Sequence, residues 1–198
     1  MAANTYLTPE ERAALESVRV GIAGAGGLGS NCAMHLVRSG VKHLTIVDFD
    51  VVNESNLNRQ FFFHDQIGQK KVEAIKANLL RIESDADIRA VDMRLDASSA
   101  REVFADCGIV VEAFDAVDAK VMLVSAFASS GKKLVTASGL AGWGRSNAMR
   151  VRKMGNIVAI GDGETSVGDG AAPVSPRVGI AAAMEANAVV SLLLGCEP

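Results

Sequence analysis

Apolar residues along the chain follow two alternating patterns. Five short apolar runs have the length and composition of strands, at residues 18–23, 43–48, 87–93, 108–112 and 133–137. Between them lie segments whose apolar residues recur at helical spacing, at residues 27–39, 69–83, 98–106 and 117–129. The clearest helical stripe consists of Val72, Ile75, Leu79 and Ile82. This alternation predicts an α/β fold, a Rossmann-like doubly wound sheet that is mostly parallel and has right-handed crossovers.

Both ends of the chain add to this core. The segment "TPEERAALE" predicts a short helix within an N-terminal arm of about residues 1–17, because Thr8 can cap it and Pro9 suits its first position. Near the other end, residues 147–152 and 156–160 flank "KMG" and predict an antiparallel hairpin at the C-terminal edge of the sheet. Ser98 is the expected cap of its helix. An Ala-rich helix over about 177–194 closes what we expect to be a single domain, 1–198.

The segment "GDGETSVGDGAAPVSP", residues 161–176, predicts a long loop. Long loops inside compact domains are usually functional or mobile. Its acids, Asp162, Glu164 and Asp169, either cover the tail of a partner protein or lie in a solvated loop, and the sequence leaves both alternatives open.

Composition narrows the class of protein. The chain is 49% hydrophobic with only 5% aromatic residues, which predicts a core of Ala, Val, Ile and Leu. A net charge of −3 gives no reason to expect nucleic-acid binding. No apolar run is long enough to span a membrane, and the N-terminal residues lack a secretory signal. Without a Cys-x-x-Cys pair we expect no zinc and a reducing, cytoplasmic setting.

The isolated cysteines and histidines are expected to be structural. Cys32 and Cys107 lie in segments predicted to pack in the core, whereas Cys196 lies near the C-terminus and is expected to be exposed. Nothing around Cys196 predicts the lowered pKa of a nucleophilic thiol. The histidines show no spacing that forms a helical pair of metal ligands; they are His35, His43 and His64.

The motif "GAGGLG" joins the first predicted strand to the next helix. Gly24, Gly26 and Gly29 match G-x-G-x-x-G, in which glycines permit a tight turn and let backbone N–H groups approach a phosphate. Asp48 ends the next strand, where an acid can accept from a ribose hydroxyl. The motif alone is compatible with a nicotinamide enzyme, or with glycines that only make a tight turn.

The following residues favour a polyphosphate. Asn56, Arg59 and Lys71 lie in one connection and offer an amide, a guanidinium and an ammonium, which a nicotinamide site does not need. Each alone could be a solvated surface residue. Asp115 follows a predicted strand at the carboxyl edge, where a carboxylate suits Mg²⁺ with phosphates. The alternative for Asp115 is an N-cap of the helix over 117–129.

These segments also carry a resemblance to a known family. The stretch "GAGGLGSNCAMHLVRSGVKHLTIVDFDVVNESNLNRQ", a later Gly-x-x-Lys, "VVEAFDAVDAK" and the closing helix resemble the adenylation domain of ThiF, MoeB and the ubiquitin-activating enzymes. The short length and "EAFD" are most similar to compact ThiF proteins. The resemblance implies an enzyme that binds ATP and Mg²⁺ and adenylates the C-terminal glycine of the ubiquitin-like sulfur carrier ThiS, for thiamine thiazole synthesis. It also implies a homodimer.

The resemblance assigns the site residue by residue. It implies that Arg59, Lys71 and Asp115 carry the chemistry, with Asp115 holding Mg²⁺. The wider ATP-binding set comprises Gly24, Gly26, Gly27, Gly29, Asp48, Asp50, Ser55, Asn56, Arg59, Lys71 and Asp115. No acid or base is assigned, because a terminal carboxylate with a pKa of roughly 3.5 is already ionised at neutral pH. The sequence departs from the family's D-x-x-D-N, since Glu112 replaces the first acid and Ala116 the Asn.

Several alternatives stay open. The family's basic N-terminal residue, which reaches the partner subunit's ATP, has only Arg12 as a candidate here. The carrier could instead belong to molybdopterin synthesis, or the chain could be a tRNA-modifying relative. The loop at 161–176 contains no cysteine, so we expect the reaction to stop at the acyl-adenylate. A nicotinamide oxidoreductase and a non-catalytic adaptor are the competing classes.

Overall fold

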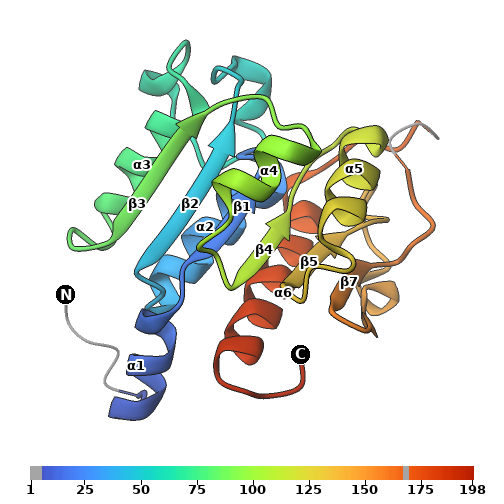
Figure 1. Cartoon of the computed structure of the whole chain (residues 1–198). Helices are drawn as coiled ribbons and strands as arrows, with labels where there is room; N and C mark the ends of the chain where they lie inside the picture. The colour runs from blue at the N-terminus through green and yellow to red at the C-terminus, as the bar shows by residue number, and fades with distance from the viewer. Residues whose placement is uncertain (1–5, 167–169) are drawn as a thin grey trace.

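The computed structural model describes residues 6–166 and 170–198 as one open sheet with helices on both faces (Figure 1). The strand order is β3-β2-β1-β4-β5-β7-β6, and only β6 runs antiparallel to its neighbour. This confirms the predicted Rossmann-like sheet and the antiparallel pair at its edge. The strands are β1 (Val20–Ala23), β2 (His43–Asp48), β3 (Asp87–Asp92), β4 (Ile109–Glu112), β5 (Lys133–Ala137), β6 (Arg150–Met154) and β7 (Ile157–Gly161).

Six α-helices and three short 3-10 turns lie within the described residues. The α-helices are α1 (Pro9–Ser17), α2 (Gly27–Ser39), α3 (Lys71–Leu80), α4 (Ala97–Val103), α5 (Val117–Phe127) and α6 (Ser175–Leu193). The 3-10 turns are η1 (Glu54–Asn56), η2 (His64–Gln66) and η3 (Ser146–Ala148). None of the helices within 6–166 and 170–198 has the length and hydropathy needed to span a membrane.

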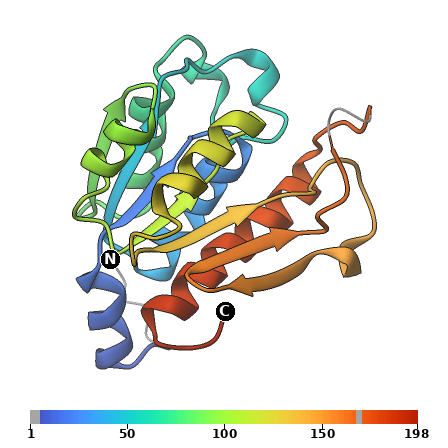
Figure 2. The ribbon, with the colours of Figure 1, turned by 45° about the vertical axis from the view of Figure 1, so that its right-hand side comes forward.

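Each face of the sheet has its own apolar core. The larger core contains side chains of α2, α3 and α6, and the smaller contains side chains of α4 and α5. Figure 2 shows α6 and α5 on opposite sides of the sheet. In the smaller core, Phe104 and Phe127 lie 6.4 Å apart between ring centroids. A Cβ at Gly21 would come within 2.5 Å of the Phe104 ring, so the glycine in the central strand makes room for this aromatic pair.

Local signals fixed most element boundaries. Thr8 caps α1, as predicted, and it also forms a capping box with Glu11. The predicted cap of α4 was wrong: Asp96, rather than Ser98, is the N-cap, and its Oδ1 accepts from the N–H groups of Ser98 and Ser99 at 2.8 Å. Asp96 precedes Ser98 by two residues, and a carboxylate can accept from both free N–H groups at once.

The loop after β7 has a buried anchor. Asp162 is 5% exposed and forms an ion pair with Arg177 of α6, with Oδ2 2.5 Å from Nη2. Its Oδ1 accepts from the N–H groups of Glu164 and Thr165. Asp162 therefore fixes the base of the loop, whereas the exposed Glu164 pairs with Arg145. Asp169 lies outside the described residues.

A second buried polar cluster lies under the carboxyl ends of β4 and β5. The Glu112 side chain is fully buried, and its oxygens lie 3.1 and 3.0 Å from Nζ of Lys120. Its Oε2 also accepts from the Thr136 hydroxyl at 2.5 Å, and its Oε1 from the Phe114 N–H at 2.8 Å. Lys120 donates to the carbonyl of Ala137 as well. This cluster therefore joins β4, α5 and β5.

Glu185 of α6 lies close to this cluster without bonding to it. It is fully buried, and neither carboxyl oxygen has a hydrogen-bond partner among the described residues. Burial, and then the charge of Glu112, raises the pKa of Glu185 well above its usual value. Glu185 is therefore expected to be a neutral acid in the folded protein.

This raised pKa predicts how Glu185→Gln changes the pH dependence of stability. The stabilisation from holding the proton is complete below the unfolded pKa of about 4.3 and is lost as pH rises toward the folded pKa. Gln stays neutral, so we expect the variant to gain on the wild type by about 1 kcal/mol or more in free energy of unfolding between pH 5 and pH 8. Urea denaturation at several pH values measures this gap.

The exposed Glu102→Gln on α4 is the matched control, because it makes the same chemical change at a surface position. A Glu185→Gln gap that stays constant from pH 5 to pH 8 would contradict a protonated Glu185.

Candidate functional site

The candidate site lies at the carboxyl edge of the sheet, at the upper edge in Figure 1. There β1 lies between β2 and β4, so the connections from β1 and β4 leave toward opposite faces. Ligands of open α/β sheets bind at such a reversal of strand order. The glycine turn after β1, Asp48 at the end of β2 and Asp115 after β4 all lie at this edge.

Two glycines of "GAGGLG" are required by the turn itself. Gly24 has φ +102°, and a Cβ there would lie 2.8 Å from the carbonyl oxygen of Ala113. A Cβ at Gly29 would lie only 1.8 Å from the carbonyl oxygen of Gly24. No larger residue fits at position 29 while α2 begins directly after β1, so Gly24 and Gly29 are explained by the fold.

Gly26 has no such explanation within the described protein. The only atom within 4 Å of its added Cβ is Nε2 of Gln60, at 3.9 Å. Gly26 is half-buried and is the N-cap of α2, with no side-chain cap. An open position at a helix N-terminus fits an anion that approaches the free backbone N–H groups. Gly26 is thus the glycine that indicates a ligand.

Gly27 faces protein as well as the open turn. Its added Cβ would lie 2.9 Å from Cγ1 of Val178 in α6 and 3.5 Å from Cγ of Arg59. That a side chain at position 27 would crowd a triphosphate stays a prediction. Because packing against Val178 also favours glycine, a larger residue at position 27 would disturb the contact between α2 and α6 at the same time.

Asp48 connects the end of β2 to the glycine turn. Its Oδ2 accepts from the N–H of Ala25 at 2.6 Å, and its Oδ1 accepts from the N–H of Asp50 at 2.8 Å. Each carboxylate oxygen can accept a further hydrogen bond. Since Asp48 remains partly exposed, it can hold the turn and still accept from a hydroxyl group of a ligand.

Lys71 and Asp50 form the next part of the site. Nζ of Lys71 lies 2.9 Å from Oδ2 of Asp50, and the lysine side chain is only 7% exposed whereas that of Asp50 is 49% exposed. The N–H of Lys71 also donates to the carbonyl of Asp50, at the start of α3. The ammonium group thus has one carboxylate partner and two further donors with which it can bind a phosphate.

Arg59 supplies a cation without a counter-ion. Nη1 donates to the carbonyl of Ser55 at 3.3 Å and to Oδ1 of Asn58 at 2.8 Å, both neutral acceptors. Within 6–166 and 170–198 it forms no ion pair. Its backbone is fixed to α2, because Nδ2 of Asn31 donates to the Arg59 carbonyl at 2.9 Å. The positive charge is therefore held in place beside Gly27 and remains available to an anion.

Asn56 has one half of its amide engaged. Its Oδ1 accepts from the N–H of Asn53 at 3.0 Å, which closes η1. Its NH₂ group makes no hydrogen bond with any described residue and can donate to a ligand. The predicted Ser55 is exposed, and its observed role is to accept from Arg59 through its backbone.

Asp115 is exposed and makes no hydrogen bond or ion pair with the residues that the structure describes. The alternative role as a helix cap is wrong, because the N-cap of α5 is Ala116 and the cap has no side-chain hydrogen bond. The described residues contain no preformed group of three metal-binding side chains. A single free carboxylate beside a phosphate site still fits Mg²⁺, which commonly binds through one or two carboxylates plus phosphates and water.

Gln60 was missed by the sequence reasoning. It is 9% exposed, its Oε1 has no hydrogen-bond partner, and its Nε2 lies closest to the open Gly26 position. Its place directly after Arg59 in "SNLNRQ" was the only signal.

Phe49 was also missed. It directly follows Asp48, is half-exposed, and lies under the guanidinium of Arg94, which is 5.3 Å from the ring centroid. An apolar ring beside Asp48 offers a stacking surface.

Other predicted candidates lie elsewhere. Arg12 is on α1 at the amino edge of the sheet, where Nη1 donates to the carbonyl of Leu7, so within one chain it does not join the site (Figure 1). Cys32 and Cys107 are buried and Cys196 is exposed, as predicted. Burial is the main cause that raises the pKa of Cys107 to about 11, so this thiol is not activated.

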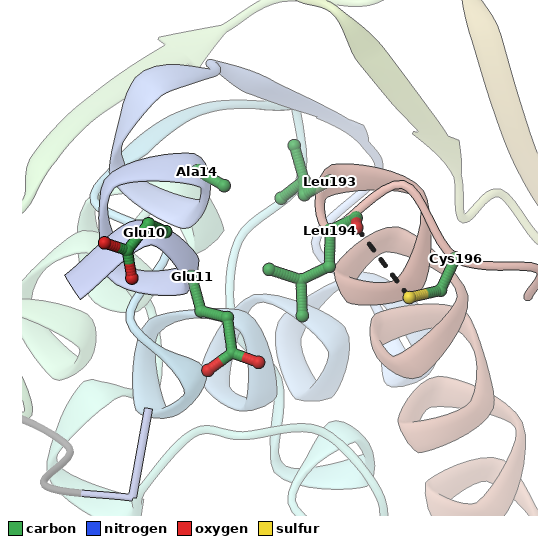
Figure 3. A pocket seen from close by; sticks show the side chains of 6 residues that line it. All are labelled: Glu10, Glu11, Ala14, Leu193, Leu194 and Cys196. Atoms are coloured by element: carbon green, nitrogen blue, oxygen red, sulfur yellow. Dashed lines mark hydrogen bonds between the residues drawn. The ribbon is translucent and has the colours of Figure 1, made fainter. Parts of the chain in front are cut away.

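A cavity of about 250 Å³ lies between α1 and the C-terminal end of the chain (Figure 3), at the amino edge of the sheet (Figure 1). Side chains of α1 and of the C-terminal end line it: Glu10, Glu11, Ala14, Leu193, Leu194 and Cys196. Its lining includes no lysine or arginine and none of the predicted site residues. The chemistry-bearing residues therefore gather at the opposite edge from this cavity.

Known proteins with similar sequences are adenylyltransferases. The chain is 37% identical over 128 residues to the adenylyltransferase and sulfurtransferase UBA4 of Eremothecium gossypii, covering 64% of this chain and 29% of that protein. It is 37% identical over 115 residues to the molybdopterin-synthase adenylyltransferase of Salmonella typhimurium, covering 58% of this chain and 46% of that protein. The match thus covers less than half the length of each relative.

The fold is also found among solved structures. The E. coli tRNA N6-threonylcarbamoyladenosine dehydratase, TcdA, in complex with AMP superposes with a TM-score of 0.86 at 18% identity, covering 94% of this chain and 90% of that chain. At this identity the likeness shows the fold. The sequence matches the ThiF family over residues 2–198, and this chain therefore belongs to the ThiF family.

Proposed function

We propose that this chain uses ATP to adenylate the C-terminal carboxylate of a ubiquitin-like sulfur carrier protein and releases pyrophosphate. The observation that carries the proposal is the charge around the open Gly26 position. Arg59 has no counter-ion among the described residues, Lys71 has one exposed partner, and Asp115 has none. Two cations and a free carboxylate beside a helix N-terminus suit a triphosphate with Mg²⁺.

In the proposed reaction, a carboxylate oxygen of the carrier attacks the α-phosphorus of ATP. A new bond forms between that oxygen and phosphorus, and the bond from phosphorus to the oxygen bridging to the β-phosphate breaks. Pyrophosphate leaves with the electron pair of that bond. The nucleophile is already ionised, so no side chain needs to remove a proton. The difficulty is that two anions must meet, and catalysis is then positioning and charge stabilisation.

Each residue has a role in that balance. Arg59 and Lys71 bind phosphate oxygens, and the N–H groups at the start of α2 bind the phosphate that lies against Gly26. Asp48 orients the ribose through its free acceptor capacity. Asp115 would hold Mg²⁺, which supplies further charge neutralisation when bound. The proposal includes no thiol step.

ThiS, in thiamine thiazole synthesis, is the carrier that we propose. The relatives' names support activation of carriers, and the molybdopterin-synthase adenylyltransferase supports that synthase's carrier as the alternative. The likeness of fold to TcdA adds a tRNA substrate to the candidates.

We also propose a cytoplasmic homodimer, in which Arg12 reaches the partner's nucleotide. ATP–pyrophosphate exchange with each carrier separates these substrates, and sedimentation measures the oligomeric state.

A nicotinamide oxidoreductase would use the glycine turn and Asp48 but would leave Arg59, Lys71 and Asp115 without a role. Isothermal calorimetry distinguishes the two classes. Binding of ATP with Mg²⁺ and no binding of NADH agree with the proposal, whereas tight NADH binding without ATP binding would overturn it. A chain that binds ATP but exchanges pyrophosphate with no carrier would be the adaptor.

Arg59→Ala is the first test of the site. Because Arg59 is a fixed charge without a counter-ion in the part of the chain that the structure describes, we expect its removal to lower the rate of ATP–pyrophosphate exchange by about two powers of ten or more. Arg89→Ala is the matched control, since Arg89 is an exposed arginine that pairs with Asp106. We expect Arg89→Ala to exchange at the wild-type rate. Near-normal exchange by Arg59→Ala would remove Arg59 from the mechanism.

The glycines allow a sharper comparison. Gly26 has φ −79°, which alanine can adopt, and its added Cβ meets no protein atom closer than 3.9 Å. We therefore expect Gly26→Ala to fold normally but to bind ATP at least about tenfold more weakly, a change of ~1.4 kcal/mol. Gly29→Ala should instead fold poorly because of its 1.8 Å contact. Thermal unfolding measures the stability of both variants, and calorimetry measures their ATP affinity. Wild-type ATP affinity in Gly26→Ala would mean that no phosphate lies beside position 26.

A further inference from the structure

The buried cluster of Glu112, Lys120 and Thr136 lies directly beside the turn that carries Asp115. We propose that Glu112 and Lys120 are positioning residues, which hold the backbone of residues 114–116 so that Asp115 faces the nucleotide. This inference rests on the proposed function, because it assigns Glu112 and Lys120 a purpose only if Asp115 acts in the site. Neither residue was assigned a role by the sequence or by the comparisons.

The geometry joins the cluster to the backbone next to Asp115. Oε1 of Glu112 accepts from the N–H of Phe114 at 2.8 Å, and Phe114 directly precedes Asp115. The Lys120 ammonium makes three hydrogen bonds, to both oxygens of Glu112 and to the carbonyl of Ala137, so all three of its donors are used. The Glu112 side chain is therefore held rigidly when it meets the Phe114 N–H.

Apart from the packing of Phe114 against the smaller core, few described contacts fix this turn. Asp115 has no hydrogen-bond or ion-pair partner among the described residues, and the N-cap of α5 has no side-chain bond. The first residue of α5, Val117, is 71% exposed and so contributes little packing. Before the turn, Ala113 is paired with β1 through its N–H. Between Ala113 and α5, the described residues show two hydrogen bonds of the turn, from the Phe114 N–H to Oε1 of Glu112 and from the Lys120 N–H to the carbonyl of Ala116. The first of these holds the residue directly before Asp115.

The cluster acts through position, since its charges cancel. The Glu112 carboxylate is paired with the Lys120 ammonium, and the neighbouring Glu185 has no ionic partner. A buried ion pair is poor evidence for a stabilising role, because well-packed apolar residues often replace such a pair without loss of stability. An apolar replacement would nevertheless remove the acceptor of the Phe114 N–H. Loss of the ion pair and loss of the Phe114 acceptor can therefore be tested separately, so a positioning role can be distinguished from a structural one.

Two double variants test the inference. Glu112→Met with Lys120→Met removes the charges and the acceptor, whereas Glu112→Gln with Lys120→Met removes the charges but keeps an amide oxygen for Phe114. We expect the first to lower kcat of ATP–pyrophosphate exchange at least about tenfold and to weaken ATP·Mg²⁺ binding in calorimetry. We expect the second to stay within about threefold of the wild type. Equal losses in both variants would overturn the inference.

A double-mutant cycle with Asp115→Asn tests the route of the effect. If Glu112 acts through Asp115, the loss caused by the double Met variant should largely disappear in the Asp115→Asn background. An equal loss in both backgrounds would mean a structural role and would overturn the inference. Arg19→Met is the control: Arg19 pairs with Asp87 and Asp106 at the amino edge, and its effect should be independent of Asp115.

Hydrogen exchange at the Phe114 amide provides a readout that does not depend on activity. In the wild type this amide should be protected, and in the double Met variant it should exchange at least about tenfold faster. Unprotected exchange in the wild type would overturn the inference even if no variant folds. If Asp115→Asn exchanges pyrophosphate like the wild type, the proposed role of Asp115 fails together with the inference. If Asp115→Asn loses exchange activity but shows no coupling to Glu112, only the inference fails.

Discussion

The close approach of α2 to the end of β1 is the constraint on which the site depends. A Cβ at Gly29 would lie 1.8 Å from the carbonyl oxygen of Gly24, so this turn can be made only with glycine. Because the helix begins immediately, its free N–H groups point to the carboxyl edge, where β2 and β4 also end. Asp48 then fixes the turn through its bond to the Ala25 N–H. The N-terminus of α2, whose free N–H groups can bind an anion, thus lies at the same edge as the ends of β2 and β4.

Charge is distributed differently at the two edges of the sheet. At the amino edge the charged groups pair with one another, as Arg19 does with Asp87 and Asp106. At the carboxyl edge Lys71 pairs with Asp50, but Arg59 and Asp115 form no ion pair among the described residues. Paired charges stabilise or orient a fold, while an unpaired guanidinium and carboxylate can each be matched by a ligand. This asymmetry separates the edge that stabilises the fold from the one proposed to bind nucleotide.

Buried polar clusters support the exposed groups. Glu112 and Lys120 lie below the Asp115 turn, and Asp162 with Arg177 fixes the base of the loop after β7. Each cluster joins elements that are distant in the chain, and each is largely closed to water. The free side chains at the site can remain unpaired because the backbone beneath them is held by groups that do not face the ligand.

The sequence by itself determined the elements and predicted the type of ligand. Hydrophobic periodicity placed the strands and helices, since local pattern reflects which side of an element is buried. The glycine spacing, Asp48, Arg59 and Lys71 lie within one segment, so the sequence could predict a common nucleotide site for them without coordinates. Choices between neighbouring capping residues were less certain, and Asp96 rather than Ser98 caps α4.

Only the tertiary structure decided which residues meet across the sheet. Gly26 has space beside it, whereas Gly27 faces Val178. This difference between the two glycines depends on where α6 packs. Likewise, Glu112 meets Thr136 through the pairing of β4 with β5, and Asp115 is left free because Ala116 occupies the cap position. These contacts join residues whose spacing in the chain carries no periodic signal. Periodicity specifies the buried face of each element, and packing specifies its neighbours.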